Sequence, residues 1–317
     1  MQSFETSQRI VVTGGAGFIG KHFISYLLDQ KHEVINIDKL TYASDKKSYA
    51  SFYDYSNYGF IHEDITSLET LPECDLLINF AAESHVDNSI RSSRHFMTTN
   101  ALGVQNLLEL TRGFEQSLRP RFIQISTDEV YGDNIEGPHT EESLLRPSNP
   151  YAASKAAADH IVQSYARTYG IDYQILRLNN NYGVRQYPEK LIPRSIARLL
   201  ENRKAQIHGD GSALRCWLHV KDAVQAIVTV VLQGNANEIY NISGNDELNV
   251  NDVVSKIAAR MDLNVEDCVE YVNDRPGQDT RYDVDDSKMR KLNWAPEISF
   301  DDGLDEIVKK TIETPHW

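Results

Sequence analysis

The densest group of reactive side chains lies in segment 124–132. A short apolar strand ends there, and Thr127, Asp128 and Glu129 follow it side by side. Adjacent carboxylates repel each other. Where their surroundings differ, their pKa values separate, so that one can act as an acid and the other as a base. The segment therefore predicts a proton-transfer pair. The alternative is an ordinary polar turn after a strand, in which acidic residues are common.

A second candidate pair is formed by Tyr151 and Lys155, at the start of an alanine-rich segment with strong helix propensity. Residues four apart lie on the same face of a helix. An ammonium beside a phenol stabilises the phenolate, so we expect Lys155 to lower the pKa of Tyr151 and make it a base near neutral pH. The alternative is an exposed pair on a solvated helix.

A glycine-rich turn, Gly15-x-Gly17-x-x-Gly20, follows apolar strand 9–13 and precedes an amphipathic helix that runs to residue 28. In this context the motif predicts a dinucleotide site, because glycines allow the backbone to approach a pyrophosphate at the helix N-terminus. Asp38 ends the next strand, 33–37, where an acidic residue can bind ribose hydroxyls. A carboxylate there favours NAD over NADP, and Lys39 weakens this preference without reversing it. Asp38 could instead cap a turn.

Strands and helices alternate along the first half of the chain, with strands expected at 9–13, 33–37, 60–65, 75–80 and 121–126 and a helix at 96–111. This alternation predicts an α/β fold, a Rossmann-type doubly wound parallel sheet with helices on both faces. Ligands of such sheets bind at the carboxyl ends of the strands. Segments 14–20, 81–84 and 127–129 and Asp38 should therefore meet at one rim.

Beyond residue 177 the alternation loosens, and segments 178–183 and 187–193 are expected to be irregular and to face a ligand. We expect a dinucleotide-binding domain at 1–178 and a smaller lobe at 179–317, with 217–235 returning to the first domain. Helices are expected at 220–232, 250–261 and 301–312. Basic residues recur in this lobe, and Arg215 and Arg275 predict a bidentate clamp on a diphosphate.

The composition narrows the class of partner. The chain has 317 residues, a net charge of −14 and a pI near 5.2, which argues against nucleic-acid and anionic-membrane binding. Its three cysteines form no metal-binding pattern, so we expect no metal site and reduced thiols in the cytoplasm. The N-terminus lacks the apolar core of a signal peptide, and no apolar run is long enough to span a membrane.

With these motifs in place, the chain resembles the extended short-chain dehydrogenases/reductases, and most closely the dTDP-glucose 4,6-dehydratase family, over essentially its whole length. The Thr-Asp-Glu triplet at 127–129 is the specific part, because related epimerases and decarboxylases generally carry other residues there. The segments that carry the resemblance are 13–20, 38–43, 81–87, 126–132, 151–155, 180–183, 188–193 and 275–277.

The resemblance implies that a nucleotide-diphosphate hexose becomes a 4-keto-6-deoxy sugar by C4 oxidation, loss of water across C5/C6 and hydride return to C6, with NAD regenerated. Tyr151, helped by Lys155 and Thr127, would take the C4 hydroxyl proton. Glu129 would remove the C5 proton, and Asp128 would protonate the departing C6 hydroxyl. The family also forms homodimers through the helices at 96–111 and 151–169, so a homodimer is expected.

The resemblance further implies two sets of binding residues. For NAD they are Gly14, Gly17, Phe18, Ile19, Gly20, Asp38, Lys39, Leu40, Thr41, Asp64, Ile65, Phe80, Ala81, Ala82, Ser84, Thr99, Tyr151, Lys155 and Asn181. For the nucleotide sugar they are Ser84, Thr127, Asn180, Lys190, Leu191, Gln206, Ile207, His208, Arg215, Asn241, Arg275 and Gln278.

Several positions depart from the family pattern. Gln206 and His208 stand where the family usually has Pro and Tyr beside the nucleobase, and the family has Asp for Cys216, His for Gln278 and Arg for Asn88. The base and the hexose therefore stay open, and a UDP-linked or N-acetylated sugar is an alternative substrate.

Three other activities remain as alternatives. The first is a 4-epimerase or uronate decarboxylase, which needs Tyr151 and Lys155 but not the acid pair. The second is a dehydratase that also epimerises C5 or releases an unsaturated sugar. The third is a non-catalytic NAD-binding scaffold, which would be expected to lose the tyrosine, the lysine or the carboxylates.

Overall fold

The computed structural model describes residues 6–134 and 137–314. Its main element is a seven-stranded sheet with the strand order β10-β6-β5-β4-β1-β2-β3, in which every neighbouring pair is parallel. The strands are β1 (Arg9–Thr13), β2 (Glu33–Ile37), β3 (Tyr58–Ile61), β4 (Leu76–Asn79), β5 (Arg121–Thr127), β6 (Tyr173–Leu178) and β10 (Glu238–Ile242). The central strands are buried on both faces, as their continuous apolar sequences require. The predicted Rossmann-type sheet is confirmed.

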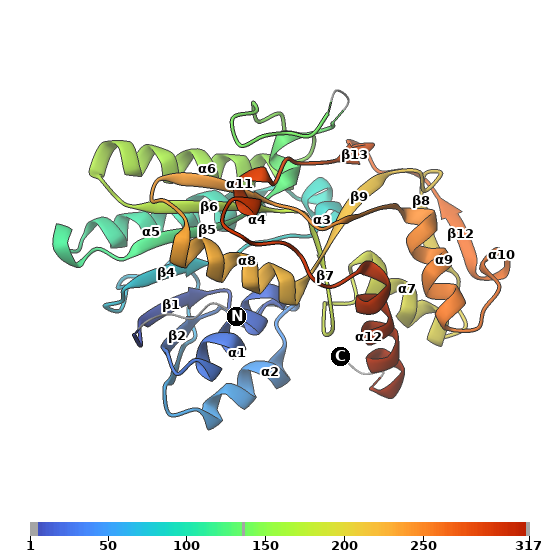
Figure 1. Ribbon diagram of the computed structural model, residues 1–317, viewed down its shortest axis with the longest axis horizontal. Coiled ribbons are helices and arrows are strands. Elements are labelled where there is room, and N and C mark those ends of the chain that lie inside the picture. The colour runs from blue at the N-terminus through green and yellow to red at the C-terminus, as the bar shows by residue number, and fades with distance from the viewer. Residues whose placement is uncertain (1–5, 135–136, 315–317) are drawn as a thin grey trace.

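Helices cover both faces of this sheet (Figure 1). On one face α1 (Phe18–Asp29) and α8 (Val220–Gln233) pack in a common apolar core. On the other face α5 (Gly103–Arg112) and α6 (Pro150–Tyr169) pack in a second core. The order of the strands reverses between β1 and β4, and ligands of doubly wound folds bind at the carboxyl ends of strands at such a point.

The start of α6 is fixed by local sequence. The side chain of Asn149 accepts a hydrogen bond from the Ala152 amide at 2.9 Å, and Pro150 occupies the first turn, where its missing N–H costs nothing. Gly170 ends the helix with φ of +67°. This cap places Tyr151 directly at the rim of the sheet.

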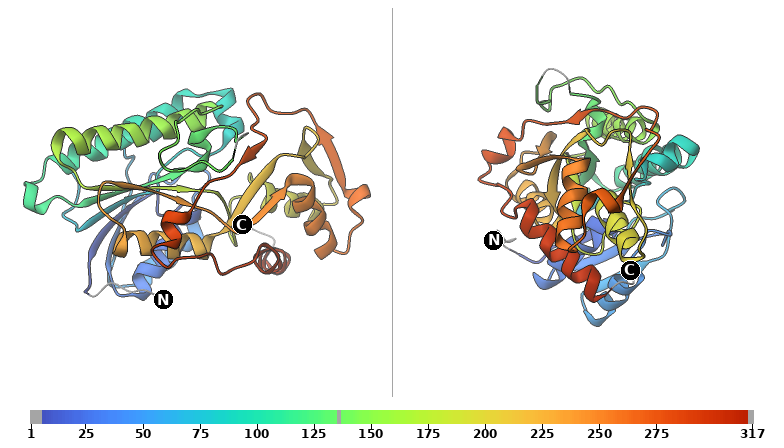
Figure 2. Two further views of the ribbon diagram at one scale, coloured as in Figure 1. Left: turned by 45° about the horizontal axis from the view of Figure 1, so that its top comes forward. Right: turned by 90° about the vertical axis from the view of Figure 1, so that its right-hand side faces the viewer.

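The second part of the chain lies beside the carboxyl ends of the main sheet, as the left view of Figure 2 shows. It holds a four-stranded sheet of β7 (Asn180–Tyr182), β9 (Leu214–His219), β11 (Asp246–Asn249) and β13 (Arg281–Tyr282), and a pair of β8 (Ala205–His208) and β12 (Val269–Val272). Helices α7 (Leu191–Leu200), α9 (Val250–Arg260) and α12 (Phe300–Glu313) share its apolar core. The shorter helices are α2 (Lys46–Ser51), α3 (Val86–Arg91), α4 (Arg94–Phe96), α10 (Val265–Cys268) and α11 (Ser287–Arg290).

Three expected elements differ from the structure. The third strand lies at Tyr58–Ile61 rather than at 60–65, and the helix expected at 96–111 is interrupted by a π-helical turn, Met97–Leu102. Segment 178–183 is not irregular, because it contains β7. Segment 187–193 is irregular only as far as residue 190, and from Leu191 it forms the start of α7, whose first turn tolerates Pro193 because that amide needs no helical partner.

The expected division at residue 178 stays a prediction. Helix α8 lies within the segment expected to return to the first domain, and it packs against α1. The following strand, β10, also belongs to the main sheet because it pairs with β6.

Within the described ranges, no helix is both long and apolar enough to cross a bilayer. The expected location of the protein in the cytoplasm also stays a prediction.

A buried ion pair joins α6 to the sheet. The Arg177 guanidinium donates to the Asp159 carboxylate at 2.9 Å and to the Tyr131 hydroxyl at 2.7 Å, and both charged side chains are at most 2% exposed. Removing one member of such a pair leaves a charge buried without its partner, which is more costly than losing an exposed pair.

We expect Asp159→Leu to lower the free energy of unfolding by about 3–5 kcal/mol, measured by chemical denaturation. The control is Glu33→Ala, which removes a carboxylate from an exposed pair with Arg9 and should cost less than about 1 kcal/mol. Equal losses in the two variants would contradict a stabilising role for the buried pair.

Candidate active site

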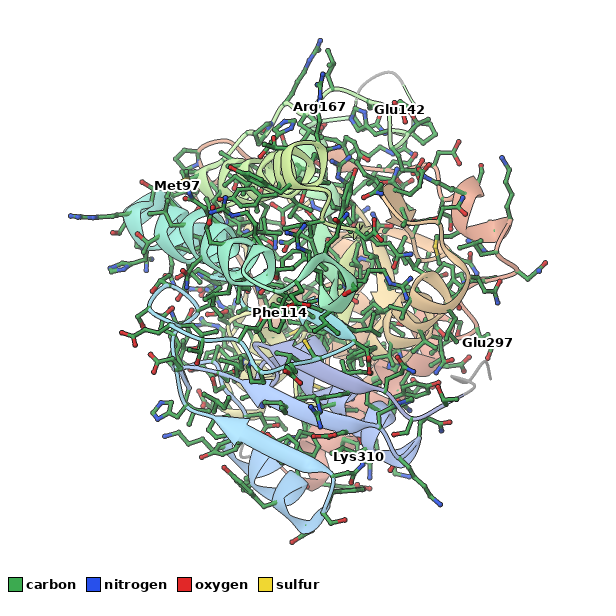
Figure 3. All side chains as sticks on the ribbon, turned by 90° about the vertical axis from the view of Figure 1, so that its left-hand side faces the viewer. Met97, Phe114, Glu142, Arg167, Glu297 and Lys310 are labelled. Carbon is green, nitrogen blue, oxygen red and sulfur yellow. The ribbon has the colours of Figure 1, made fainter. Side chains whose placement is uncertain are left out.

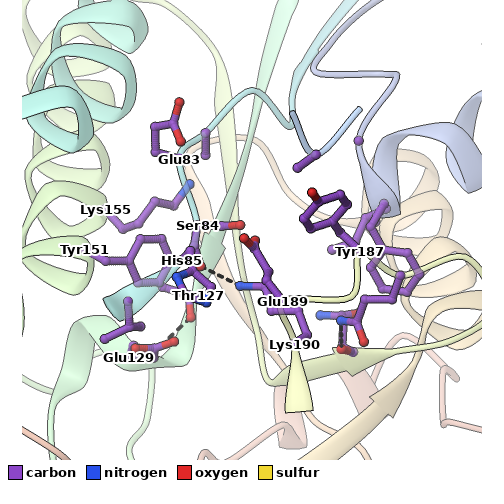
Figure 4. A pocket seen from close by; sticks show the side chains of 18 of the residues that line it. Glu83, Ser84, His85, Thr127, Glu129, Tyr151, Lys155, Tyr187, Glu189 and Lys190 are labelled. Atoms are coloured by element: carbon purple, nitrogen blue, oxygen red, sulfur yellow. Dashed lines mark hydrogen bonds between the residues drawn. The ribbon is translucent and has the colours of Figure 1, made fainter. Parts of the chain in front are cut away.

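A cavity of about 430 Å³ lies at the carboxyl ends of the main sheet. One wall comes from the loops that follow β1, β2, β4 and β5, and the other from β7, α7, β8 and the loop at 273–279. Figure 4 shows Tyr151 and Lys155 projecting from α6 toward Thr127 and Glu129, with Lys190 on the facing side. The predicted gathering of these segments at one rim is therefore what the structure has.

The glycine-rich turn allows a ligand to come close to the protein backbone. Gly14 has φ of +70°, and a Cβ there would lie 2.5 Å from the Ala81 amide nitrogen. A Cβ at Gly20 would lie 2.5 Å from the Gly14 carbonyl oxygen. Gly17 caps α1 without any side chain, so no side chain of its own blocks the amides of the first helical turn. The turn fits an anionic group at the helix N-terminus.

Asp38 closes the same end of the cavity. Its carboxylate accepts hydrogen bonds from the amides of Ala16 at 2.9 Å and Leu40 at 2.7 Å, and burial raises its pKa. Oδ1 also accepts from Ser44 Oγ at 3.4 Å, whereas Oδ2 has only the Ala16 amide and can still receive a ribose hydroxyl. Leu40 itself does not line the cavity, because it turns away with φ of +54° and contributes its amide to Asp38.

Tyr151 is buried, and its surroundings differ from those expected. The structure contradicts a lowered phenol pKa: burial and the neighbouring charge of Glu129 raise the pKa of Tyr151, while a hydrogen bond with Thr127 opposes them. Lys155 donates to the Ile125 carbonyl oxygen at 2.6 Å, and burial lowers its pKa to about 8. Burial outweighs the ammonium in the free protein because the lysine is tied to the backbone of β5.

Asp128 and Glu129 lie in different surroundings, as the first hypothesis requires. Asp128 is 2% exposed, and burial together with the charge of Glu129 raises its pKa to about 7. Burial also raises the pKa of Glu129, and the nearby charges of Arg215 and Lys190 oppose that rise. A pKa near 7 makes Asp128 a suitable proton donor at neutral pH. Arg215 acts on both carboxyl groups, but at Glu129 it is the largest influence that opposes burial, whereas at Asp128 the hydrogen bonds of Asn179 and Thr127 come before it.

Sequence reasoning missed the asparagines that hold this pair. Asn179 donates to Asp128 Oδ2 at 2.6 Å, and Asn149 donates to Glu129 at 3.4 Å. Asn100, in the π-helical turn, donates to Ser154 Oγ at 2.8 Å and bonds both backbone polar groups of Glu83. The repeated asparagines at 179–181 were a visible sequence feature, but their partners are distant along the chain.

Basic side chains surround the other end of the cavity. Lys190 donates to the Ser84 carbonyl oxygen at 2.6 Å, and the Arg215 guanidinium lies 4.2 Å above the centre of the Tyr282 ring. Arg275 pairs with Asp87 of α3 at 2.6 Å, a contact that joins the two parts of the chain across the cavity. These cations can neutralise a diphosphate, the ligand that the sequence predicts here.

Of the three β8 residues expected beside the nucleobase, two face the cavity and one faces the core. Gln206 and His208 of β8 line the cavity, whereas Ile207 between them is 1% exposed and belongs to the core, because successive side chains of a strand point to opposite faces. The Gln206 amide donates to Glu270 at 2.9 Å and accepts from Arg194. Its hydrogen-bonding groups are thus already engaged within the protein.

Asn241 is also placed wrongly by the sequence analysis. It is fully buried away from the cavity, where it accepts from the Tyr131 hydroxyl at 2.8 Å and donates to the His139 carbonyl oxygen at 3.1 Å. Leu40, Ile207 and Asn241 are the predicted site residues that do not line the cavity, and all the others do. Among the described residues, no group of three or more potential ligands is arranged to hold a metal ion.

Comparison with known proteins agrees with this geometry. A family model described as GDP-mannose 4,6 dehydratase matches residues 11–307. The chain is 43% identical over 304 residues to the low-salt glycan biosynthesis protein Agl12 of Haloferax volcanii, covering 94% of this chain and 97% of that protein.

Solved structures are similar over nearly the whole chain. DesIV of Streptomyces venezuelae, a dTDP-glucose 4,6-dehydratase solved with NAD bound, has a TM-score of 0.92 and 40% identity, covering 96% of this chain and 97% of its own. A UDP-glucuronic acid 4-epimerase of Bacillus cereus, solved with UDP-glucuronic acid and NAD, has a TM-score of 0.91 and 28% identity, covering 96% and 99%. The chain therefore belongs to the GDP-mannose 4,6 dehydratase family, within the extended short-chain dehydrogenases/reductases.

Proposed function

We propose that this protein is a NAD-dependent 4,6-dehydratase of a nucleotide-diphosphate hexose, forming the 4-keto-6-deoxy sugar. The observation that carries the proposal is the pair of buried Asp128 and half-buried Glu129, which face the same cavity as Tyr151. An epimerase needs the phenol, but it has no use for an acid and a base aimed at C6 and C5. The dTDP-glucose 4,6-dehydratase DesIV is the relative that supports this reaction type.

NAD would lie along the glycine turn, with its ribose hydroxyls at Asp38 and its nicotinamide toward Tyr151. The positive φ of Gly14, the absent side chain at Gly17 and the free acceptor capacity of Asp38 fit such a group. Ser126 Oγ and Asn181 Oδ1 are buried at the cavity wall without hydrogen-bond partners among the described residues, which suits contact with a polar ligand. When bound, NAD would supply the hydride acceptor for oxidation at C4 and, in its reduced form, the hydride donor for reduction at C6.

The residues of the chain would handle the protons. Tyr151 would take the proton of the C4 hydroxyl once the positive charges of Lys155 and bound NAD⁺ offset the burial that raises the phenol pKa in the free protein, and Thr127 would hydrogen-bond O4. The resulting ketone acidifies C5, where Glu129 removes the proton and its electron pair forms the C5=C6 double bond. The C6–O bond breaks, and Asp128 protonates the departing oxygen so that water leaves. When the hydride is returned to C6, Glu129 gives its proton back to C5, which yields the saturated 4-keto-6-deoxy sugar. Asp128 is suited to this step because its raised pKa keeps it protonated near neutral pH.

Removal of the acid should block water loss selectively. We expect Asp128→Asn to slow dehydration by about 10²–10⁴-fold, while the sugar is still oxidised at C4. Quenched reactions analysed by mass spectrometry should then contain a 4-keto hexose that keeps its C6 hydroxyl. In the wild type, water loss should fall as pH rises above about 7, because Asp128 becomes ionised there.

The matched control is Asp172→Asn, an exposed carboxylate outside the cavity, which should leave the rate unchanged. Full water loss in Asp128→Asn, or oxidation abolished together with dehydration, would contradict the assignment of Asp128 as the acid of the elimination.

The overall reaction is tested by incubating the purified protein with dTDP-, UDP-, GDP- and CDP-hexoses and weighing the products. Loss of one water from one of them is the expected result, and NAD should be released when the protein is denatured. An unchanged mass with an inverted C4 would identify a 4-epimerase, the activity of the Bacillus cereus relative. Bound NAD without any product would leave only the scaffold role and refute the proposal.

We also propose a homodimer. Met97 and Leu102, in the π-helical turn beside α6, are 43% and 56% exposed, and Figure 3 shows Met97 on the outer side of the molecule. A second copy packed against α5 and α6 would cover these apolar side chains.

Light scattering at micromolar concentration should give twice the chain mass of 36.0 kDa, and a monomer would refute the dimer. Met97→Glu combined with Leu102→Lys should weaken it.

A further inference from the structure

We propose that Asn179 is a positioning residue for the acid, which directs the proton of Asp128 toward the substrate side of the cavity. This inference rests on the proposed dehydratase reaction. It assigns a role to a residue that the sequence analysis placed in no site. Asn179 directly follows β6, is 3% exposed and lines the cavity.

The backbone holds this residue firmly. The Asn179 amide donates to the Ile242 carbonyl oxygen at 3.1 Å, and its own carbonyl oxygen accepts from the Asn181 side chain at 2.9 Å. These two bonds anchor Asn179 between the ends of β6 and β10. Its side chain then reaches Asp128 Oδ2 at 2.6 Å, the shorter of the two hydrogen bonds to that carboxyl group.

The two oxygens of Asp128 have partners of different chemistry. Oδ2 accepts from the Asn179 amide nitrogen, which can only donate. Oδ1 lies 3.1 Å from the Thr127 hydroxyl, which can donate or accept. When Asp128 is neutral, a proton on Oδ2 would face the N–H of Asn179, so the proton must lie on Oδ1.

The position of Thr127 determines where a proton on Asp128 Oδ1 lies relative to the substrate. Asp128 Oδ1 faces the Thr127 hydroxyl, and Thr127 is in turn hydrogen-bonded to Tyr151, which takes the C4 proton in the proposed reaction. The proton of Asp128 is therefore held on the same side as the reacting sugar and away from β6. The acid can deliver it to the C6 oxygen without first rotating its carboxyl group.

The other polar atom of the Asn179 side chain is its amide oxygen, Oδ1. Asn179 Oδ1 is buried and has no hydrogen-bond partner among the described residues. No other described contact thus holds that end of the amide, and its orientation depends on the bond to Asp128. If the amide were reversed, its oxygen would face Asp128 and stabilise the neutral acid, with the opposite effect on its titration.

The test compares Asn179→Leu with the wild type as holoenzyme, measuring the single-turnover rate of water loss against pH. Loss of the donor should destabilise the carboxylate, so the decline of rate at high pH should move upward by about one pH unit. The rate below that decline should fall by about tenfold, because the acid is no longer oriented. C4 oxidation, followed by mass analysis of quenched samples, should continue.

Two further variants separate positioning from general damage. Asn179→Ser keeps a donor and should shift the decline less than Asn179→Leu. Asn57→Leu removes an amide that donates to the His32 carbonyl oxygen at 2.6 Å, at the start of β3 and outside the cavity, and should keep the wild-type profile. If Asn179→Leu does not fold, Asn179→Ala replaces it in the comparison with Asn179→Ser.

An unchanged pH profile in Asn179→Leu, or a decline that moves to lower pH, would overturn the inference. So would identical profiles for the leucine and serine variants. These outcomes are distinct from failure of the proposed function, which would show as no water loss by the wild type from any nucleotide hexose.

Discussion

The structure depends on burying two adjacent carboxyl groups beside a phenol at the end of one strand. Moving a carboxylate out of water costs free energy, and protonation of the carboxyl group reduces that cost. Burial and the charge of Glu129 raise the pKa of Asp128, while cations on the facing wall act mainly on Glu129. Repulsion between neighbours, a cost in an ordinary turn, here adds to burial in raising the pKa of Asp128.

The rest of the fold keeps that arrangement rigid. An all-parallel sheet brings the end of β5 next to the glycine turn, and the asparagine cap of α6 sets Tyr151 at the same rim. The Asp159–Arg177 pair locks α6 to β6. Amide side chains hold both carboxyl groups, and amides can orient acids without adding charge to a water-poor site.

The sequence predicted most of this architecture because its main features are local. Strands 9–13 and 33–37, the glycine turn and the start of α6 are specified by apolar runs and by turn and cap residues close in the chain. Strand β7 was missed because its three residues pair with β9, far along the sequence. The core position of Ile207 follows from strand alternation, once β8 is known to be a strand. The raised pKa of Tyr151 and the partners of Asn179 depend on contacts between distant segments, which no local pattern contains.

The pairing of β10 with β6 has a consequence for how the chain folds. Residues 179–237 lie between these two neighbouring strands, so much of the second part must be synthesised before the sheet gains its last strand. A polypeptide ending at residue 178 would leave β6 as an open edge and would lack α8 over the apolar face, both of which promote aggregation. Residues up to 178 thus do not complete the main sheet by themselves. Completion of that sheet is coupled to the folding of the segment that lies between β6 and β10.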